Sequence, residues 1–479
     1  MSRESETTDD RQPNSVPDTT EVLILGGGAG GYVTAVRAAQ LGLDVTIVER
    51  DAYGGTCLNT GCIPSKALIH GADVAHEATN AEQFGITAEV ETDLGQLLDW
   101  KDGVVDQLTG GVKQMCTANG VTLVDGEGRF VDDHRAAVVT NDEETTIDFE
   151  YAVVATGSRP IELPGFDFDG EHILASSDLL TLDYTPDSLL IVGAGYIGME
   201  LSMALSKLGV DITVVEMLDD VLPMYDDEIS QVVRERAVDL GVAFRFGEAA
   251  ADWEPTDGGI VVTTETEDGT TTDHAADAWG VGGAGLRTDE TVILPAVEVV
   301  QRCGCFIWSE RLGRRERVDT YAVCVVAGGS MLAHKALVGG GVPAVAITGE
   351  PAAIDGTWIP AAVFTDPEIA SVGLTSEAAD AAGYTPVVGR TSLMANGRAP
   401  TIDATDGFVR IVADEPTGRL LGAQIVAPTA SELIGELTLA VEAGMNLDSI
   451  TRTVHAHPTL SEAVAEAAAD ARGEGLHSH

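Results

Sequence analysis

Two cysteines five residues apart carry the clearest chemistry in this sequence. Cys57 and Cys62 lie in the glycine-rich stretch 54–66, and Pro64 follows the second cysteine. Because proline is tolerated in the first turn of a helix, the apolar-periodic run after it predicts a helix that begins at Cys62. The amides and positive dipole at a helix N-terminus favour a thiolate, and such settings lower the pKa of a cysteine from about 8.5 to roughly 3.5–7.5. Cys57 lies just upstream on flexible backbone, so the pair predicts a redox-active disulfide.

A metal half-site or two unrelated thiols are the alternatives for this pair. A zinc site needs a second pair of ligands with a short spacing. The other cysteines are Cys116, Cys303, Cys305 and Cys324. A thiol site built from the last three would lack a usual zinc spacing, so we expect no metal. Six cysteines in 479 residues are too few for a secreted disulfide scaffold, and one catalytic pair in a reducing compartment fits better.

A strand, a glycine-rich turn and a helix precede the cysteines and must position them. A buried strand is expected over 21–25, a helix follows to about residue 41, and a second strand over 45–48 ends at Glu49. The glycines of the turn are Gly26, Gly28 and Gly31. They match G-x-G-x-x-G in its required context, so the backbone can approach a pyrophosphate at the helix N-terminus. Glu49 is placed to accept a hydrogen bond from a ribose hydroxyl.

The same unit returns after an offset of 167 residues (193 − 26). Gly26, Gly28, Gly31, Gly42, Asp44, Thr46 and Glu49 correspond to Gly193, Gly195, Gly198, Gly209, Asp211, Thr213 and Glu216. Two dinucleotide folds predict two dinucleotides, and one must be a flavin because a nicotinamide alone does not easily pass electrons to a disulfide. The first fold adjoins the cysteines and should hold FAD, so the second should hold the nicotinamide cofactor. Acidic Asp219 and Asp220 follow Glu216 where NADP would call for arginine, which favours NAD.

A second candidate catalytic pair lies near the C-terminus. In His455-Ala456-His457-Pro458-Thr459-Leu460-Ser461-Glu462, a histidine is followed five residues later by a glutamate across a proline turn. These two side chains can form a general base and the group that orients it. The alternative is a turn that contains a structural histidine.

With these motifs in place, the chain resembles the flavin-dependent disulfide oxidoreductases, and among them the dihydrolipoamide dehydrogenases. The resemblance covers nearly the whole chain outside residues 279–347. It implies that His457 is the base, Glu462 its partner and His455 structural, with a cis bond before Pro458.

The same resemblance implies further flavin contacts. Thr156 and Gly157 would pass beside FAD, the backbone near Gly128 would contact its adenine, and Ala333 would belong to the same site. Lys66 and Glu200 would pair near N5 of the flavin, where the lysine would stabilise negative charge on the reduced ring. The alternative for this pair is two solvated surface residues.

The implied fold is α/β, with two Rossmann-like dinucleotide-binding domains and an α/β C-terminal dimerisation domain. The expected parts are a disordered acidic tail (1–20), an FAD-binding domain with the disulfide (21–157), an NAD-binding domain (158–284), a central domain (285–356) and an interface domain (357–479). The implied reaction is FAD-dependent oxidation of dihydrolipoamide to lipoamide with reduction of NAD by a homodimer. The substrate would be free dihydrolipoamide or a lipoyl-bearing protein. A glutathione-reductase-like disulfide reductase and a flavin-free lipoyl-binding protein are the alternatives.

The charge of the chain narrows its partners and its location. Lys and Arg number 27 and Asp and Glu 77, which gives a formal net charge of −50. Such a chain repels nucleic acid and anionic membranes. At about 1 M salt the Debye length is only ~3 Å, which screens the self-repulsion, so we expect a salt-rich cytoplasm and a halophilic source. The alternative is an acidic protein of a mesophile. We also find no apolar run long enough to span a membrane, and no signal peptide.

One stretch departs from the family pattern. Between 279 and 319 arginine is unusually frequent, and the expected A-x-G-R-x-P turn is not recognisable. Further on, Cys324 and Val325 stand where the family has Gly-Asp, whose aspartate holds the ribityl chain. Residues 337–347 also have an odd composition where a helix is expected. The hypothesis is a sequence error over about 279–320, with local errors to about 347.

Overall fold

The computed structural model describes residues 15–256, 258–281, 285–287, 299–302, 306–309, 320–323, 330–352 and 358–476. The chain forms two compact units, and each is described by itself. Unit 1 comprises Met1–Pro64, Lys101–Arg159 and Gly285–Ile354. Unit 2 comprises Ser65–Trp100, Pro160–Ala284 and Asp355–His479.

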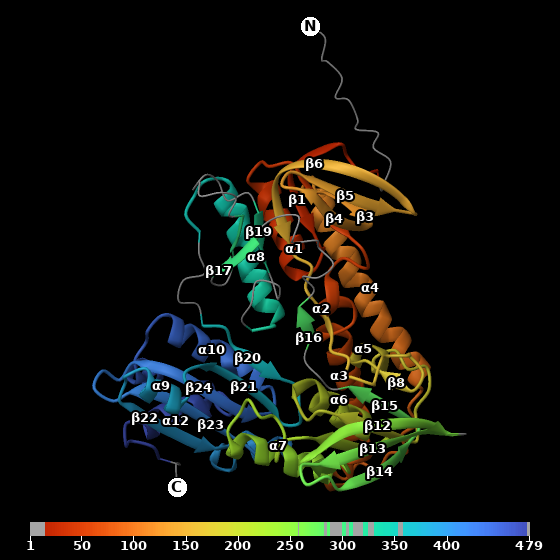
Figure 1. Cartoon of the computed structure of the whole chain (residues 1–479). Coiled ribbons are helices and arrows are strands. Elements are labelled where there is room, and N and C mark those ends of the chain that lie inside the picture. Colours follow the sequence, from red (N-terminus) through yellow and green to blue (C-terminus); the bar gives the residue numbers. More distant parts are fainter. Residues whose placement is uncertain are drawn as a thin grey trace. The chain divides into compact units, whose positions relative to one another are not determined.

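Unit 1 is built on a mixed sheet with a parallel centre (Figure 1). Its central strands run in the order β19 (Thr320–Ala322), β6 (Glu143–Val154), β1 (Thr19–Leu25), β2 (Val45–Glu49) and β3 (Thr122–Asp125), and they pair in parallel. The strands β4 (Glu127–Asp132) and β5 (Arg135–Thr140) add an antiparallel ribbon to β6. The order is completed by β17 (Val299–Arg302) and β18 (Phe306–Ser309) beyond β19. Most residues of β1, β2 and β19 and the last residues of β6 are buried, because helices and the ribbon cover the two faces of the sheet.

The helices of unit 1 are α1 (Ala29–Gln40), α2 (Gly55–Asn59), the start of α3 (Cys62–Thr79), most of α4 (Leu94–Ala118), and α8 (Ala333–Ile347). The hydroxyl of Thr34 in α1 donates to the carbonyl of Gly340 in α8 at 2.7 Å. A Cβ on Gly340 would lie 2.8 Å from the carbonyl oxygen of Gly30, so this glycine permits the close approach of the two helices. The helix expected over 337–347 therefore forms, although Pro343 lies inside it.

Unit 2 repeats the parallel architecture. Its strands run in the order β11 (Ala243–Phe246), β10 (Asp211–Glu216), β9 (Ser188–Val192), β15 (Ala278–Val281) and β8 (Ile173–Leu174), all parallel. The helices α5 (Ser176–Leu179), α6 (Tyr196–Lys207) and α7 (Asp227–Asp239) accompany this sheet. An antiparallel sheet of β12 (Glu248–Thr256), β13 (Gly259–Thr266) and β14 (Thr271–Ala276) takes the place that the β4–β5–β6 ribbon has in unit 1.

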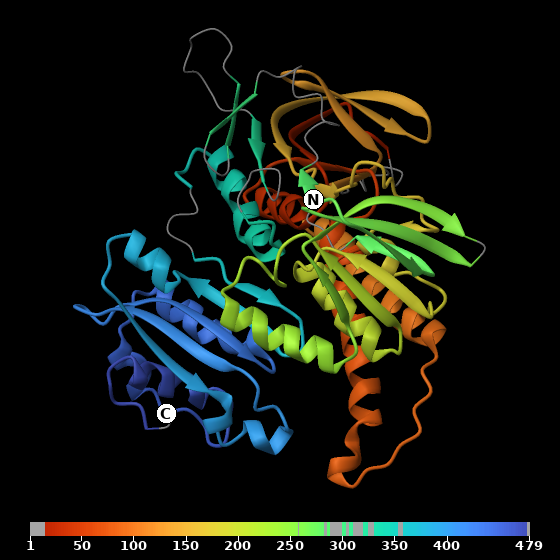
Figure 2. The same cartoon turned by 60° about the horizontal axis from the view of Figure 1, so that its bottom comes forward.

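Another antiparallel sheet forms the C-terminal part of unit 2 (Figure 2). Its order is β20 (Ala361–Val363), β21 (Glu368–Gly373), β24 (Leu420–Ala427), β23 (Phe408–Asp414) and β22 (Pro386–Ser392). The helices α9 (Ser376–Ala381), α10 (Ala430–Glu442), α11 (Leu447–Arg452) and α12 (Glu462–Asp470) belong to the same part, with the short 3₁₀ helices η4 (Leu393–Ala395) and η5 (Ala399–Ile402). Aliphatic side chains of α10 and α12 share one apolar core with this sheet.

The predicted α/β class with two dinucleotide-type sheets and a C-terminal α/β domain is confirmed. The helical sequence expected over 66–118 divides into α3, the short η1 (Ala81–Phe84) and α4. The first strand, β1, begins at Thr19, two residues earlier than expected and inside the expected tail. Residues 1–14 of that tail lie outside the described residues. The short β7 (Ser158–Pro160) and β16 (Gly285–Arg287) complete the strands.

At both ends of the stretch suspected of sequence errors, the described residues belong to regular elements, β15 and α8. Trp279 is fully buried, and its ring centroid lies 4.5 Å from that of Phe166. The other end is the helix α8. Cys303, Cys305, Cys324 and Val325 lie outside the described residues, so the hypothesis about them stays a prediction. Among the described helices, none is long and apolar enough to cross a membrane.

Candidate active site

The cysteine loop folds back on itself in unit 1. Cys57 is half-buried on the short helix α2, and Cys62 is exposed as the first residue of α3, at the N-terminal end predicted from the sequence. A Cβ on Gly61 would lie 2.9 Å from the carbonyl oxygen of Thr56 and 3.6 Å from Cα of Cys57. The backbone of Gly61, next to Cys62, therefore lies close to that of Cys57, and the redox pairing of the two cysteines stays a prediction.

The first glycine loop contacts the cysteine loop directly. The Gly54 amide donates to the carbonyl oxygen of Gly27 at 2.8 Å. Within the glycine loop, a Cβ on Gly31 would collide with the carbonyl oxygen of Gly26, and a Cβ on Gly26 would collide with that of Ala155. Only glycine fits at these two positions, where α1 begins close to the end of β1. The sequence predicted FAD in the first fold because the cysteines adjoin that fold. The hydrogen bond between Gly54 and Gly27 joins the two loops and agrees with this prediction.

The carboxylate of Glu49 contacts the same glycine loop. Its Oε2 accepts a hydrogen bond from the amide of Gly27 at 2.5 Å, and its Oε1 accepts one from the amide of Asp51 at 2.7 Å. The sequence predicted a contact with a ribose but not these backbone contacts. A carboxylate has about four acceptor sites, so one fixed in this way can still accept from a ribose hydroxyl.

The second glycine loop reproduces these contacts 167 residues later. Glu216 accepts from the amide of Ala194 at 2.8 Å and from that of Leu218 at 2.9 Å, and these residues match Gly27 and Asp51 at the same offset. The amides of Gly26 and Gly193 likewise donate to the last-but-one residues of β2 and β10, at 2.9 and 2.8 Å. The internal repeat seen in the sequence is therefore also a repeat of hydrogen bonds.

Both loops have the geometry that a dinucleotide requires. The helices α1 and α6 begin after Gly28 and Gly195, which have no side chain that could cap them. Elsewhere the chain uses side-chain caps: Asp226, Thr375 and Asn446 accept from the first turns of α7, α9 and α11. The first amides of α1 and α6 can thus receive a pyrophosphate, so the residues present fit two dinucleotides.

The other predicted flavin contacts lie on unit 1. Thr156 and Gly157 follow β6 after one residue, Ala155, beyond the last parallel pair of β6 with β1. Gly128 lies in β4, where a Cβ would meet the side chain of Leu25 at 2.6 Å. Ala333 is the first residue of α8. Their contacts with a flavin remain a proposal.

Lys66 and Glu200 pair, although they are 134 residues apart. Lys66 Nζ lies 2.7 Å from Glu200 Oε2 and 4.5 Å from the ring centroid of Phe364. The other carboxylate oxygen of Glu200 accepts from the Phe364 amide at 2.8 Å. Glu200 is only 6% exposed, which excludes the alternative of a solvated surface residue for it. Phe364, which the sequence did not indicate, contacts both members of the pair. It also places a π face beside the ammonium group, an arrangement that stabilises a cation.

His457 and Glu462 form the predicted pair on unit 2. His457 Nδ1 lies 3.0 Å from Glu462 Oε1, and the amide of Thr459 donates to Glu462 Oε2 at 2.9 Å. The Thr459 amide, followed by the hydrogen bond from His457, lowers the pKa of the Glu462 carboxyl below its usual value. His457 is 75% exposed, and the bond before Pro458 is cis, as the resemblance implied.

His455 occupies a different environment from His457. Its side chain is 7% exposed, and Nε2 lies 3.0 Å from Glu436 Oε1 on α10. The structural role predicted for it agrees with this contact.

An ionic cluster in unit 2 was not visible in the sequence. Lys207 is 6% exposed and lies 2.6 Å from Asp73 and 2.9 Å from Asp366. Burial alone would raise the pKa of Asp366, but Lys207 and Arg236 lower it further than burial raises it. A second ion pair joins Arg234 on α7 to Asp220 at 2.9 Å. It brings an arginine near the end of β10, although the sequence directly after β10 contains none. Because Asp220 neutralises this arginine, the expected preference for NAD over NADP is unchanged.

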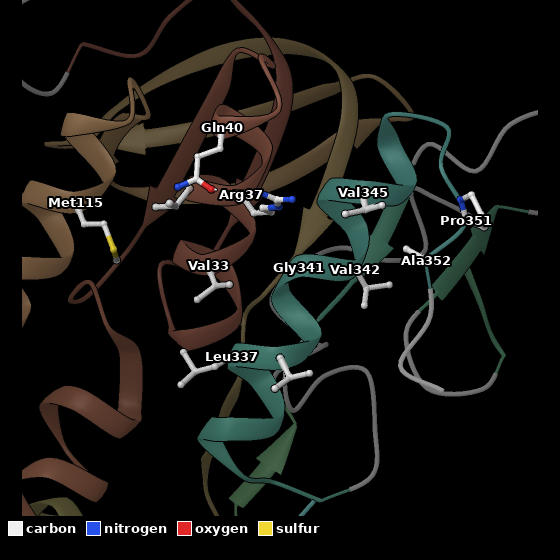
Figure 3. Close-up of a pocket in the computed structure, with 12 residues that line it drawn as sticks. Val33, Arg37, Gln40, Met115, Leu337, Gly341, Val342, Val345, Pro351 and Ala352 are labelled. Carbon is white, nitrogen blue, oxygen red and sulfur yellow. Dashed lines mark hydrogen bonds between the residues drawn. The ribbon is translucent and has the colours of Figure 1, made fainter. Parts of the chain in front are cut away.

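A groove of about 530 Å³ lies between α1 and α8 of unit 1 (Figure 3). Aliphatic residues such as Val33, Leu337 and Val342 line it, with Arg37, Gln40 and Met115 at one side. None of the predicted site residues lies in it. Among the described residues, no cluster of three histidines, cysteines or carboxylates is placed to hold a metal ion.

Comparison with known proteins defines the class of this chain. Residues 20–340 match the family of pyridine nucleotide-disulphide oxidoreductases, and residues 359–468 match the dimerisation domain of that family. The chain therefore belongs to the pyridine nucleotide-disulphide oxidoreductases, and the family resemblance drawn from its motifs is confirmed.

Its relatives narrow the class. The chain is 54% identical over 462 residues to dihydrolipoyl dehydrogenase 2 of Haloarcula marismortui, and the matched residues cover 96% of this chain and 98% of the relative. It is 52% identical to dihydrolipoyl dehydrogenase of Haloferax volcanii, over 96% of this chain and 98% of the relative. Among solved structures, LpdA of Mycobacterium tuberculosis is similar with a TM-score of 0.85 and 30% identity, over 94% of this chain and 99% of that chain.

Proposed function

We propose that this chain is a dihydrolipoamide dehydrogenase, which oxidises dihydrolipoamide to lipoamide and reduces NAD. The observation that carries the proposal is its similarity, over 96% of the chain, to proteins named dihydrolipoyl dehydrogenase. The contact between His457 and Glu462 also supports it. FAD and NAD, when bound, would supply the two-electron transfer from the dithiol to the nicotinamide. The two glycine loops would hold them, FAD at Gly26–Gly31 and NAD at Gly193–Gly198.

His457 acts as the base. Because Glu462 accepts the hydrogen bond from Nδ1, the imidazole carries its proton there, which leaves the Nε2 lone pair to remove a proton from a substrate thiol. The resulting thiolate attacks the sulfur of Cys57, and the Cys57–Cys62 bond breaks. Cys62 leaves as a thiolate at the N-terminus of α3, which stabilises it. The second substrate thiol then displaces Cys57 and closes the lipoamide ring.

Lys66 lies one helical turn beyond Cys62 on α3. Glu200 and Phe364 fix its ammonium group, so Lys66 presents a positive charge on the same helix face as the thiolate. A flavin that becomes more negative on reduction would be stabilised there.

The match to the dimerisation domain supports a homodimer. In the family arrangement, the histidine–glutamate pair of one subunit serves the cysteine pair of the other. The reducing substrate is free dihydrolipoamide or a lipoyl group on a partner protein. The net charge of −50 and the halophilic relatives support a salt-rich cytoplasm as the location.

Steady-state assay of NADH formation in molar KCl tests the function. We expect activity with dihydrolipoamide and NAD, and little with glutathione disulfide and NADPH. Cys57→Ser should abolish it, whereas Cys116→Ser, at a buried cysteine on α4, should not. Activity that survives Cys57→Ser, or a folded and flavin-loaded protein that prefers glutathione disulfide, would contradict the proposal.

A further inference from the structure

The backbone around His457 has an anchor on each side. His457 itself is largely exposed, so packing of its own ring does not fix its position. On the N-terminal side, the side chain of His455 is 7% exposed and hydrogen-bonded to Glu436 on α10. On the C-terminal side the backbone passes through Thr459, whose amide donates to Glu462.

Asn396 provides the anchor on the C-terminal side. It lies between η4 and η5 and is 7% exposed. Its Nδ2 donates to the carbonyl oxygen of Thr459 at 3.0 Å. Its Oδ1 accepts from the amides of Arg398 at 2.9 Å and Ala399 at 3.1 Å. A buried amide that makes three hydrogen bonds to backbone has one favourable orientation, so it holds Thr459 rigidly.

Thr459 is consequently fixed at both of its backbone polar groups. Its carbonyl oxygen is held by Asn396 and its amide points at Glu462, whose other oxygen contacts His457. The loop of Asn396 also reaches the ring itself, because a Cβ on the next residue, Gly397, would lie 3.7 Å from His457 Cε1.

We propose that Asn396 is a positioning residue for the catalytic pair: by holding Thr459, it holds Glu462 against Nδ1 of His457 and so determines which imidazole nitrogen carries the proton. The inference rests on the proposed function, in which His457 acts as the base through Nε2. Asn396 does not contact the reacting atoms.

The electrostatics of the pair agree with this arrangement. The Thr459 amide is the main cause that lowers the pKa of Glu462, so releasing Thr459 should raise that pKa toward the ordinary value of about 4.3. His455, whose own partner is Glu436, also lowers the pKa of Glu462. Neither residue is changed in the variants that test Asn396.

Asn396→Asp is the sharpest test. Aspartate can still accept from Arg398 and Ala399, but it cannot donate to Thr459, whose carbonyl oxygen it repels. The tautomer of His457 is measured by ¹⁵N NMR of histidine-labelled protein in molar KCl, and kcat and KM are measured with dihydrolipoamide. We expect the Nδ1–H tautomer to dominate in the unchanged protein and a mixed population in the variant. We expect kcat/KM to fall about tenfold, mostly in kcat, a part of the roughly 10²–10⁴-fold that a general base contributes.

Asn446→Ala is the matched control. Asn446 accepts from the Ser449 amide at 3.0 Å and caps α11 in the same domain, without a bond to the pair. It should leave the His457 tautomer unchanged. If Asn396→Asp does not fold, Asn396→Ser replaces it, because a hydroxyl can still accept locally but is too short to reach Thr459.

A folded Asn396 variant that keeps the Nδ1–H tautomer and kcat/KM within twofold would overturn the inference. The NMR measurement needs no turnover, so it separates this inference from the proposed function. If the unchanged protein lacks dehydrogenase activity while the Asn396 variant still shows the expected tautomer shift, the function is refuted and the positioning role is supported.

Discussion

Replacing Glu462 by glutamine changes the charge of the catalytic pair while keeping its size. Glu462 accepts two hydrogen bonds, from His457 Nδ1 at 3.0 Å and from the Thr459 amide at 2.9 Å. A hydrogen bond to a charged group contributes about 1.5–3 kcal/mol. If the bond to His457 is worth this amount as the imidazolium forms, kcat/KM should fall roughly 10- to 150-fold, at about 1.4 kcal/mol for each factor of ten. Because Glu462 is 29% exposed, solvent screens the pair and the lower half of this range is expected.

The same variant has a pH signature in stability. The pKa of Glu462 is lowered in the folded chain by the Thr459 amide and by His457. The ionised carboxylate therefore adds stability that is fully present above the unfolded value of about 4.3 and disappears as the pH falls through the lower folded value. The difference in unfolding free energy between the unchanged protein and Glu462→Gln should shrink over that acidic range.

Steady-state kinetics in molar KCl at neutral pH measure the main effect, and circular dichroism checks that the variant is folded. Glu248→Gln is the matched control, because it alters another histidine–carboxylate contact, His274 Nε2 to Glu248 Oε2 at 3.2 Å, and leaves the pair and both of its anchors intact. We expect its kcat/KM to stay within about threefold, since neither residue contacts the pair or the reacting atoms. The reasoning is refuted if the two glutamine variants lose activity equally, or if Glu462→Gln loses none.

Three further predictions concern other parts of the chain. Lys207→Met removes the ammonium group that lies between Asp73 and Asp366 and leaves Arg236 as a partner of Asp366, so the free energy of unfolding by urea should fall by about 3 kcal/mol. Exposed Lys113→Met should cost less than about 1 kcal/mol, and equal effects of the two variants would contradict the importance of the cluster. Glu216→Ala removes the carboxylate acceptor at the second glycine loop, so the KM for NAD should rise about tenfold and the ratio of kcat/KM for NAD to that for NADP should fall. Unchanged kinetics with both cofactors would exclude a role of Glu216 in binding. Burial raises the pKa of Cys116 to about 11, so alkylation at pH 8 after reduction should modify Cys57 and Cys62 but not Cys116, as peptide mass mapping would show.

Backbone rules made the two dinucleotide folds predictable from the sequence. Gly26 and Gly31 are required wherever a strand and a helix approach a phosphate so closely, and their counterparts recur at one fixed offset. The start of α3 at Cys62 followed from the position of Pro64 for the same kind of local reason.

Contacts between distant segments were not predictable in this way. Phe364 meets Lys66 and Glu200 from 298 and 164 residues away (364 − 66 and 364 − 200), through a backbone amide and a ring face that have no motif. Asn396 reaches Thr459 through a turn whose sequence would suit any loop. The ionic cluster around Lys207 likewise depends on four separate elements. Only the assembled fold places these residues together.

The central claim is that Cys57 and Cys62 exchange electrons with a flavin under control of the His457–Glu462 pair. An anaerobic titration of the purified protein with dihydrolipoamide in molar KCl, followed by visible absorbance, tests it most directly. The account predicts a flavin band that gains a long-wavelength charge-transfer shoulder as Cys62 becomes a thiolate. Cys57→Ser should show that shoulder before any dithiol is added. A colourless protein, or a flavin band that dihydrolipoamide leaves unchanged, would contradict the claim.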